Sequence, residues 1–236
     1  MRKLILALDT LPVLRAAATA PDVDVVAAAT LAELAAVDAV RLGVNEELNP
    51  VTEQDVIEVR RVSRTFELSM SVSPGLLKVA LEAQPDRVVV GLAAREGGLP
   101  SQPIDFRVRG ISLAPIARPL ADAGVPVSAL VKPEIEAVKA AHGEGVDGVE
   151  IFTGAIVDLP PADRSRELER LGDAARLASK LRLRVSAAGG LGYRSVRELI
   201  EYAPAVDAVV VGRAAVARAV LVGLDRALRD LRALVG

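Results

Sequence analysis

Arg184-Val185-Ser186-Ala187-Ala188-Gly189-Gly190-Leu191-Gly192 and Ala208-Val209-Val210-Val211-Gly212-Arg213 are the two stretches that decide the fold. Each is a short apolar run, typical of a buried parallel strand, that ends in glycine where a helical pattern begins. Glycine leaves backbone N–H groups open to a ligand, and a helix start adds partial positive charge for an anion. In an α/β barrel, the loops after the last two strands are the usual phosphate site. We therefore predict a phosphate site at Gly189, Gly190, Gly212 and Arg213; the alternative is tight packing turns with Arg213 directed outward.

Similar apolar runs recur along the chain, each followed by a longer amphipathic stretch. They lack the alternation of half-exposed strands, which is typical of parallel strands buried on both faces. The runs are Lys3–Asp9, Ala39–Val44, Phe66–Ser71, Arg87–Val90, Val127–Val131, Gly148–Phe152, Arg184–Ala187 and Ala208–Val211. Eight strands alternating with about eight helices predict a single (β/α)8 TIM barrel, one domain over residues 1–236. A doubly wound sheet is the alternative, but Asp9-Thr10-Leu11-Pro12 lacks the glycine-rich turn expected after its first strand.

Helix starts are marked in several of the intervening stretches. Thr52 precedes an acidic first turn, and Pro74 follows Ser73 at the first helical position. Further starts are predicted at Pro133, at Pro161–Asp163 and at Tyr193–Ser195. One last helix is predicted over residues 214–234, with an apolar face made of Val216, Val220, Leu224, Leu228 and Leu231.

Composition narrows the class of protein. The chain has 236 residues, no cysteine and a net charge of -2 with both signs interspersed. This excludes a disulfide framework and a thiolate nucleophile, favours a cytoplasmic location, and speaks against a nucleic-acid or membrane partner. Three Phe, two Tyr and no Trp leave a core of Ala, Val and Leu. The first apolar run ends at Asp9 and is too short for a secretory signal, so it is interpreted as a buried strand.

Two carboxylates lie where barrel enzymes place their chemistry, at or near strand ends. Glu150 interrupts an otherwise apolar strand, and a buried carboxylate must be paired, neutral or functional. Asp9 closes the first strand, with Arg15 on the helix that follows. We predict Glu150 and Asp9 as acid, base or substrate ligand; a structural ion pair in the barrel mouth is the alternative for Glu150. Asn45, at the end of the second strand, is a further ligand candidate.

Other polar residues carry weaker signals. Ser69 on the third strand and Lys132 at the end of the fifth are minor candidates, while His142 at a helix C-terminus is an ordinary structural choice. One histidine, no cysteine and no tight acidic cluster predict no metal site. The irregular stretch from Gly91 to about Gly110 is either an active-site loop or a surface connection.

Taken in order, several segments resemble the pyridoxine 5′-phosphate synthase family through nearly the whole chain. The most telling is Val149-Glu150-Ile151-Phe152-Thr153-Gly154. The others are Asp9 to Arg15, Val51 to Val56, Leu68 to Val72, Glu96 to Leu99, Leu120 to Ser128, Ala187 to Leu191, and Gly212 to Leu224. The site residues that match the family's motifs are Asp9, Arg15, Glu150, Thr153, Gly154, Gly189 and Gly212.

The resemblance implies a reaction. The family joins 1-deoxyxylulose 5-phosphate to 3-amino-2-oxopropyl phosphate, giving pyridoxine phosphate, inorganic phosphate and water, with no metal or organic cofactor. It also implies a cytoplasmic homo-oligomer built from barrel dimers, with Thr153 and Gly154 among the substrate- and phosphate-binding residues.

This sequence departs from the family where proton transfer is done. Thr10 and Phe152 stand where the family has histidines, Ser69 replaces its strand-three glutamate, and its histidine and arginines after strand two are absent. One positioned acid or base is typically worth about 10²–10⁴-fold in rate. We therefore expect a divergent member that binds a phosphorylated small molecule and catalyses an acid/base condensation, elimination or isomerisation. The alternatives are a non-catalytic phosphate-ester-binding or partner subunit, and a true synthase with a rearranged site.

Overall fold

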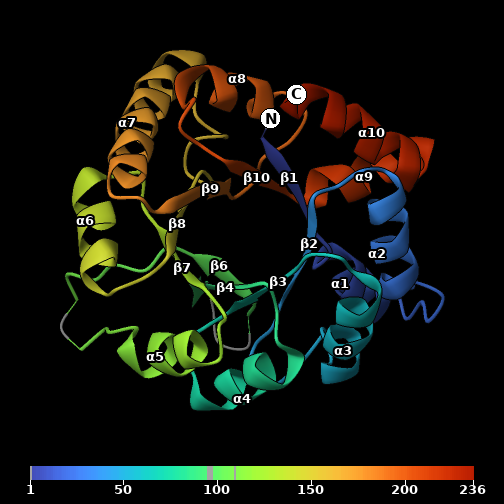
Figure 1. The fold of residues 1–236 in the computed structure, drawn as a ribbon. Coiled ribbons are helices and arrows are strands. Elements are labelled where there is room, and N and C mark those ends of the chain that lie inside the picture. Colours follow the sequence, from blue (N-terminus) through green and yellow to red (C-terminus); the bar gives the residue numbers. More distant parts are fainter. Residues whose placement is uncertain (1, 95–97, 109) are drawn as a thin grey trace.

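The apolar runs form the wall of a closed barrel (Figure 1). The computed structural model describes residues 2–94, 98–108 and 110–236. Within them, eight parallel strands close in the order β1-β10-β9-β8-β7-β4-β3-β2, which confirms the predicted (β/α)8 TIM barrel. The strands are β1 (Lys3–Ala7), β2 (Ala39–Gly43), β3 (Phe66–Met70), β4 (Arg87–Val90), β7 (Val127–Val131), β8 (Gly148–Phe152), β9 (Arg184–Ala188) and β10 (Ala208–Val211). The predicted bounds differ from these by at most two residues.

Helices surround the barrel on the outside (Figure 1). They are α1 (Thr10–Ala17), α2 (Val25–Leu34), α3 (Glu53–Val62), α4 (Pro74–Ala83), α5 (Ala114–Asp122), α6 (Ile135–Gly143), α7 (Pro161–Lys180), α8 (Ser195–Tyr202), α9 (Arg213–Val222) and α10 (Leu224–Val235). The predicted start at Thr52 is confirmed as a capping box with Asp55, because each side chain bonds the other residue's backbone N–H. None of the described helices is long and apolar enough to cross a membrane.

The prediction of one final helix over residues 214–234 is wrong. Gly223 adopts φ +81° and ψ 155°, which ends α9, and α10 begins at the next residue. That backbone conformation is open to glycine and strained for other residues. The predicted single apolar face is therefore divided: Leu228 and Leu231 are buried, whereas Val220 is 77% exposed.

A repeated contact ties the strands into pairs at their amino-terminal ends. Four aspartates each precede a strand, and each both donates and accepts a hydrogen bond with the strand before it in the sequence. Asp38 bonds Leu4, Asp86 bonds Phe66, Asp147 bonds Val127 and Asp207 bonds Val185, with N···O distances of 2.7–3.0 Å. The aspartate side chain accepts a hydrogen bond from the strand residue's N–H. The strand residue's carbonyl oxygen accepts one from the aspartate's backbone N–H. These Asp–strand contacts fix the register of β1 with β2, β3 with β4, β7 with β8, and β9 with β10.

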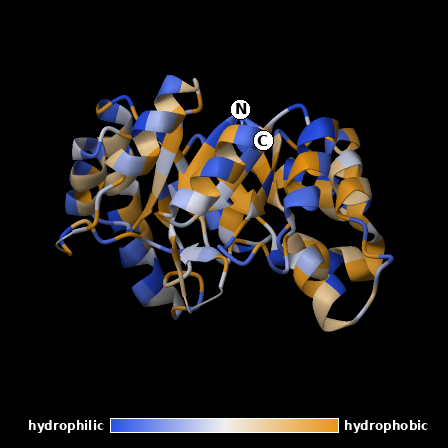
Figure 2. Ribbon diagram, turned by 90° about the horizontal axis from the view of Figure 1, so that it is seen from below, coloured by the Kyte–Doolittle hydropathy of each residue, from blue (hydrophilic) through white to orange (hydrophobic). Residues whose placement is uncertain are grey.

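Most of the core lies between the strands and the helices. Figure 2 shows apolar residues concentrated on the strands and on the inward sides of the helices. The barrel lumen, the space enclosed by the strands, holds a separate small apolar cluster of Ile5, Ala39, Ala208 and Val210. Polar and charged side chains of β2, β3, β8 and β9 are also buried. Small residues on β1 and β10 thus leave room for long side chains from the other strands.

The Asp–strand contacts yield a stability prediction. Replacing Asp207 by alanine leaves the N–H of the buried Val185 without its acceptor, which costs about 1–3 kcal/mol in the free energy of unfolding. Asp207→Asn keeps an oxygen acceptor and should recover most of that loss. Urea unfolding measures both variants beside Asp22→Ala, an exposed control expected to change stability by less than about 0.5 kcal/mol. A loss for Asp207→Ala no larger than that of the control would contradict a structural role for this contact.

Candidate active site

A cavity of about 1080 Å³ opens at the carboxyl ends of the barrel strands. Active sites of α/β-barrel enzymes lie at this end, because the βα loops meet there. Seven of the ten predicted site residues line the cavity: Asp9, Glu150, Gly154, Gly189, Gly190, Gly212 and Arg213. The fold therefore brings most of the candidates together from four different strand ends.

The loop after β9 is held tightly in place. Thr153 donates a hydrogen bond from Oγ1 to the carbonyl oxygen of Gly189 at 2.5 Å, and its N–H bonds Ala188 O at 2.7 Å. Gly189 has φ +113°, and a Cβ there would lie 2.9 Å from the Phe152 ring. Gly190 also has a positive φ, +69°. Only glycine meets both demands without strain, so the loop presents bare backbone to the cavity.

The loop after β10 forms the neighbouring wall. Gly212 lies against β1, where a Cβ would come within 3.0 Å of Ala7 O. Arg213 and Ala214 are the first two residues of α9, so their N–H groups have no acceptor inside the helix. Both residues line the cavity, and Arg213 is exposed. In the described ranges, no carboxylate pairs with Arg213. The arrangement offers an anion two helix-end amides and one cationic side chain.

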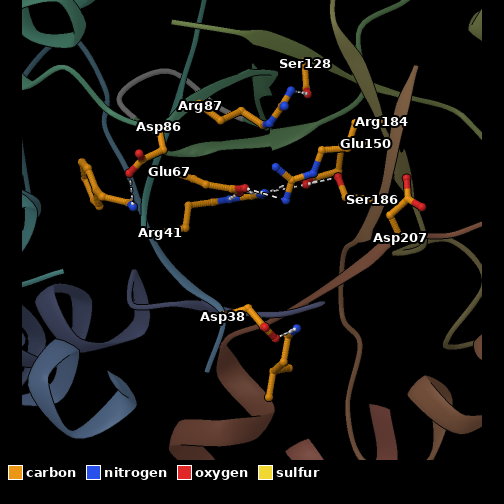
Figure 3. Close-up of polar contacts among 12 residues, drawn as sticks. Asp38, Arg41, Glu67, Asp86, Arg87, Ser128, Glu150, Arg184, Ser186 and Asp207 are labelled. Carbon is orange, nitrogen blue, oxygen red and sulfur yellow. Dashed lines mark hydrogen bonds and ion pairs between the residues drawn. The ribbon is translucent and has the colours of Figure 1, made fainter. Parts of the chain in front are cut away.

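The floor of the cavity is a buried ion network that sequence reasoning missed in part (Figure 3). Arg41 on β2 donates to both oxygens of Glu150, at 2.7 Å each, from Nη1 and Nη2. It also donates to Glu67 Oε2 from Nη2 at 2.6 Å and from Nε at 3.1 Å. Arg184 adds a longer bond to Glu67 at 3.3 Å, and the Ser186 hydroxyl donates to Glu150 at 2.9 Å. Arg41, Glu67 and Glu150 are each less than 5% exposed.

This network defines what Glu150 does in the folded chain. Its two oxygens accept three hydrogen bonds, two of them from a cation, so the carboxylate is held in one orientation. It is well suited to fix Arg41 at the bottom of the cavity.

Asp9 is placed differently. Its side chain is half-buried in the cavity and accepts the N–H of Gly43 at 2.5 Å. No ion-pair partner is found for it in the described part of the chain. Burial raises the pKa of Asp9, and the Gly43 hydrogen bond and the charge of Arg41 offset that rise only in part. A carboxyl with a raised pKa in a cavity is a candidate for proton transfer.

Three predicted residues lie outside the cavity lining. Arg15 forms a two-bond ion pair with Asp55, at 2.6 and 2.9 Å. Asn45 is buried; its Nδ2 donates to the carbonyl oxygen of Asn49, and its Oδ1 accepts the N–H of Asn49. Thr153 lies behind Gly189, as described above. Arg15 and Asn45 both brace the loop after β2, and Thr153 braces the loop after β9.

The minor candidates divide in the same way. Ser69 lines the cavity, whereas Lys132 is outside the lining and lies 3.8 Å from Asp105. In the stretch from Gly91 to Gly110, β5 (Leu92–Ala93) and β6 (Pro100–Gln102) form a hairpin. Four of its residues, Leu99 to Gln102, line the cavity, so this stretch borders the site. Glu96 and Gly97 of the family-like motif lie outside the described residues.

Arg41 and Glu67 are the site residues that sequence reasoning missed. Each is a lone charge inside an apolar strand, which is the same signal that singled out Glu150. The strand register explains their pairing, since Arg41 and Glu67 are direct neighbours across β2 and β3.

Fold and cavity together define the class: an α/β-barrel protein with its site at the carboxyl ends of the strands. The family model described as "Pyridoxal phosphate biosynthesis protein PdxJ" matches residues 4–236, and the chain belongs to this family. The pyridoxine 5′-phosphate synthase of Desulforapulum autotrophicum is 34% identical over 100% of this chain and 99% of its own length. That of Geobacter metallireducens is 33% identical over 98% and 97%. The family expected from the sequence is confirmed.

Solved structures share the fold at much lower identity. A 3-hexulose-6-phosphate synthase matches with a TM-score of 0.64 and 17% identity, over 99% of this chain and 100% of that one. A thiamine phosphate pyrophosphorylase from Pyrococcus furiosus matches with a TM-score of 0.60 and 17% identity, over 99% and 95%. These two likenesses bear on the barrel architecture alone.

The state of Asp9 yields a prediction about stability and pH. A group whose pKa is raised on folding stabilises the fold below its unfolded pKa, about 3.9 for aspartate, and loses that contribution as pH rises through its folded pKa. Asp9→Asn removes the buried charge and keeps an acceptor for Gly43. We expect it to be more stable than the natural chain at pH 7, with the difference shrinking toward about pH 4.

Urea unfolding at both pH values measures this difference. Asp55→Asn is the matched control of opposite sign, because hydrogen bonds from Arg15 and Thr52 outweigh burial and lower the pKa of Asp55. It should lose stability at pH 7 and lose less at low pH. An Asp9→Asn variant less stable than the natural chain at pH 7 would show that the Asp9 carboxylate is favoured in the fold.

Proposed function

We propose that this chain is a divergent enzyme of the pyridoxine 5′-phosphate synthase family that binds a phosphorylated small molecule. It would catalyse an acid/base condensation, elimination or isomerisation step on that molecule, without metal or organic cofactor. The observation that carries the proposal is the composition of one cavity. An anion-binding end at Gly189, Gly190, Gly212 and Arg213 shares it with Asp9, a carboxyl whose pKa is raised.

The phosphate end is supported by chemistry and by position. Unpaired amides at the start of α9 and the side chain of Arg213 suit a dianionic group. The bracing of Gly189 by Thr153 and the packing of Gly154 against Phe152 hold the loop in one conformation. A loop already ordered loses less entropy when a ligand binds.

The proton-moving end is assigned to the two predicted carboxylates in different roles. Asp9 is the group that takes or gives a proton, because its pKa is shifted toward neutrality and no cation is bonded to it in the described ranges. Glu150 acts through Arg41, whose guanidinium it fixes at the floor.

A non-catalytic role, as a phosphate-ester-binding or partner subunit, is the second candidate. It is favoured by Thr10 and Phe152, which line the cavity where the family resemblance places histidines. An unmodified pyridoxine 5′-phosphate synthase with a rearranged site is the third candidate, and the names of the similar proteins favour it.

Assembly as a homo-oligomer built from dimers belongs to the same proposal. Exposed apolar residues on α1 and α9, among them Leu14, Val220 and Leu221, supply a surface that association would cover. A cytoplasmic location and the absence of a nucleic-acid or membrane partner stay predictions from composition.

Phosphate binding is tested first, by calorimetric titration of inorganic phosphate. Arg213→Gln should weaken binding by roughly tenfold, because a hydrogen bond to a charged group is worth about 1.5–3 kcal/mol. Arg194→Gln is the matched control, since Arg194 is an exposed arginine outside the cavity lining. If the natural chain and Arg213→Gln bind phosphate equally, the site lies elsewhere.

Turnover is tested with the family's two substrates and with a panel of phosphosugars. Asp9→Asn should lower the rate by about 10²-fold or more while phosphate-ester binding persists. Glu46→Gln, an exposed carboxylate in the loop after β2, serves as the control and should leave the rate unchanged. Binding without turnover would establish the non-catalytic candidate, and formation of pyridoxine phosphate the rearranged synthase. Failure to bind any phosphate ester would overturn the proposal.

A further inference from the structure

Arg41 has one donor left over in its ion network. A guanidinium group carries five N–H donors in one plane. Glu67 accepts two of these N–H groups, one from Nε and one from Nη2. Glu150 accepts two more, the second N–H of Nη2 and one N–H of Nη1. Among the described residues, the second N–H of Nη1 has no acceptor. Arg41 itself lines the cavity.

The strand register shows which residues flank Arg41 in the barrel wall. Its neighbour on β3 is Glu67, which occupies the Nε–Nη2 edge of the guanidinium. Its neighbour on β1 is Ala7, whose methyl group blocks little space. Asp9 lies two residues beyond Ala7 and bonds Gly43, two residues beyond Arg41. Asp9 and Arg41 therefore lie in one corner of the cavity, close enough for the charge of Arg41 to act on the Asp9 carboxyl.

The network also sets the charge of this corner. Burial lowers the pKa of Arg41, but the charges and hydrogen bonds of Glu150 and Glu67 outweigh it, so the pKa is raised and the group stays protonated. Arg41 is ion-paired with both Glu67 and Glu150, Arg184 adds a longer contact to Glu67, and Arg87 on the neighbouring strand β4 is a further cation of the lumen. Arg41 already has two carboxylate partners, so a neutral carbonyl oxygen suits its remaining donor better than a third carboxylate, which would be repelled by Glu67 and Glu150.

We propose that Arg41 is a ligand-contacting residue whose free Nη1 N–H donates to a carbonyl oxygen, at the end of the ligand remote from the phosphate. The inference rests on the proposed function, because it assumes that a phosphate ester occupies the cavity. Asp9 then removes a proton from the carbon beside that carbonyl. The C–H bond breaks, its electron pair forms a C=C bond, and the carbonyl pair moves to oxygen as an enolate beside Arg41. No oxidant or further reactant is needed, and Asp9 returns the proton in the reverse step.

A fixed donor is effective in this role. Charge develops on the carbonyl oxygen during proton removal, and a pre-positioned cation stabilises it without reorganisation. Glu67 and Glu150 are positioning residues in this scheme, since each acts by holding Arg41. Arg41 on β2, Glu67 on β3 and Glu150 on β8 therefore all contribute to the same ligand contact.

The test measures the binding of three ligands to the full chain by calorimetry. They are inorganic phosphate, dihydroxyacetone phosphate and glycerol 3-phosphate. The last two differ at one carbon, which is a ketone in dihydroxyacetone phosphate and an alcohol in glycerol 3-phosphate. The natural chain should bind the ketone more tightly than the alcohol. Arg41→Lys keeps a positive charge between Glu67 and Glu150 but loses the planar donor set. It should reduce the preference for the ketone by roughly tenfold and leave affinity for inorganic phosphate unchanged.

Arg87→Lys is the matched control. Arg87 is a partly buried lumen arginine that donates to Ser128 and does not line the cavity, so the ketone preference should survive its replacement. If Arg41→Lys does not fold, the uncharged variant Arg41→Met/Glu67→Gln/Glu150→Gln takes its place, because it leaves no unpaired charge among these three groups.

The outcomes separate the two proposals. A ketone preference that persists in the Arg41 variant, or that is absent from the natural chain, overturns the role of Arg41 while phosphate binding stands. Failure of the natural chain to bind inorganic phosphate overturns the proposed function itself. Loss of the preference in the Arg41 variant alone, with phosphate affinity retained, establishes Arg41 as a ligand contact.

Discussion

The guanidinium of Arg41, held between Glu67 and Glu150, is the interaction on which the arrangement of the barrel lumen depends. A buried charge is tolerated only when it is paired and hydrogen-bonded, and this one is engaged on two edges. The pairing joins β2 to its neighbour β3 and, across the lumen, to β8. It is possible because β1 and β10, which follow β2 around the barrel on the side away from β3, contribute small or apolar residues to the lumen, Ala7 and Ala208 among them. The same contact closes the floor of the cavity and defines what can lie above it.

That floor changes the roles of the remaining carboxyls. Glu150 accepts bonds from Arg41 and Ser186, so its lone pairs are committed to structure. Asp9, just beyond β1, accepts a hydrogen bond from a backbone donor, and burial raises its pKa. Where the family resemblance places histidines, Thr10 and Phe152 line the cavity. Under the proposed function, proton transfer rests on one titrating group, Asp9, and one fixed donor, Arg41.

The barrel could be predicted from the sequence because its strands are buried on both faces and therefore appear as continuous apolar runs between helical stretches. Their ends were placed within two residues. The division of the last helix at Gly223 was missed, since a single glycine inside an apolar periodicity does not by itself end a helix. Glu150 was recognised as a charge out of place, with an ion pair as one of its two interpretations. Its partner could not be identified, because Arg41 lies 109 residues away and only barrel closure brings the two strands to opposite sides of one lumen.

The glycines of the last two loops show why packing and ligand binding need not compete as explanations. Gly189 is required by its positive φ and by the Phe152 ring, and Gly212 by the close approach of Ala7. These are structural reasons, sufficient without any ligand. Yet the same contacts fix the loop backbone and clear side chains from the cavity wall beside Arg213. A backbone that cannot move and has no Cβ in the way is what an anion site made of amides requires. The packing demand is therefore the means by which such a site is built, and the distinguishing feature is the cationic side chain placed next to it.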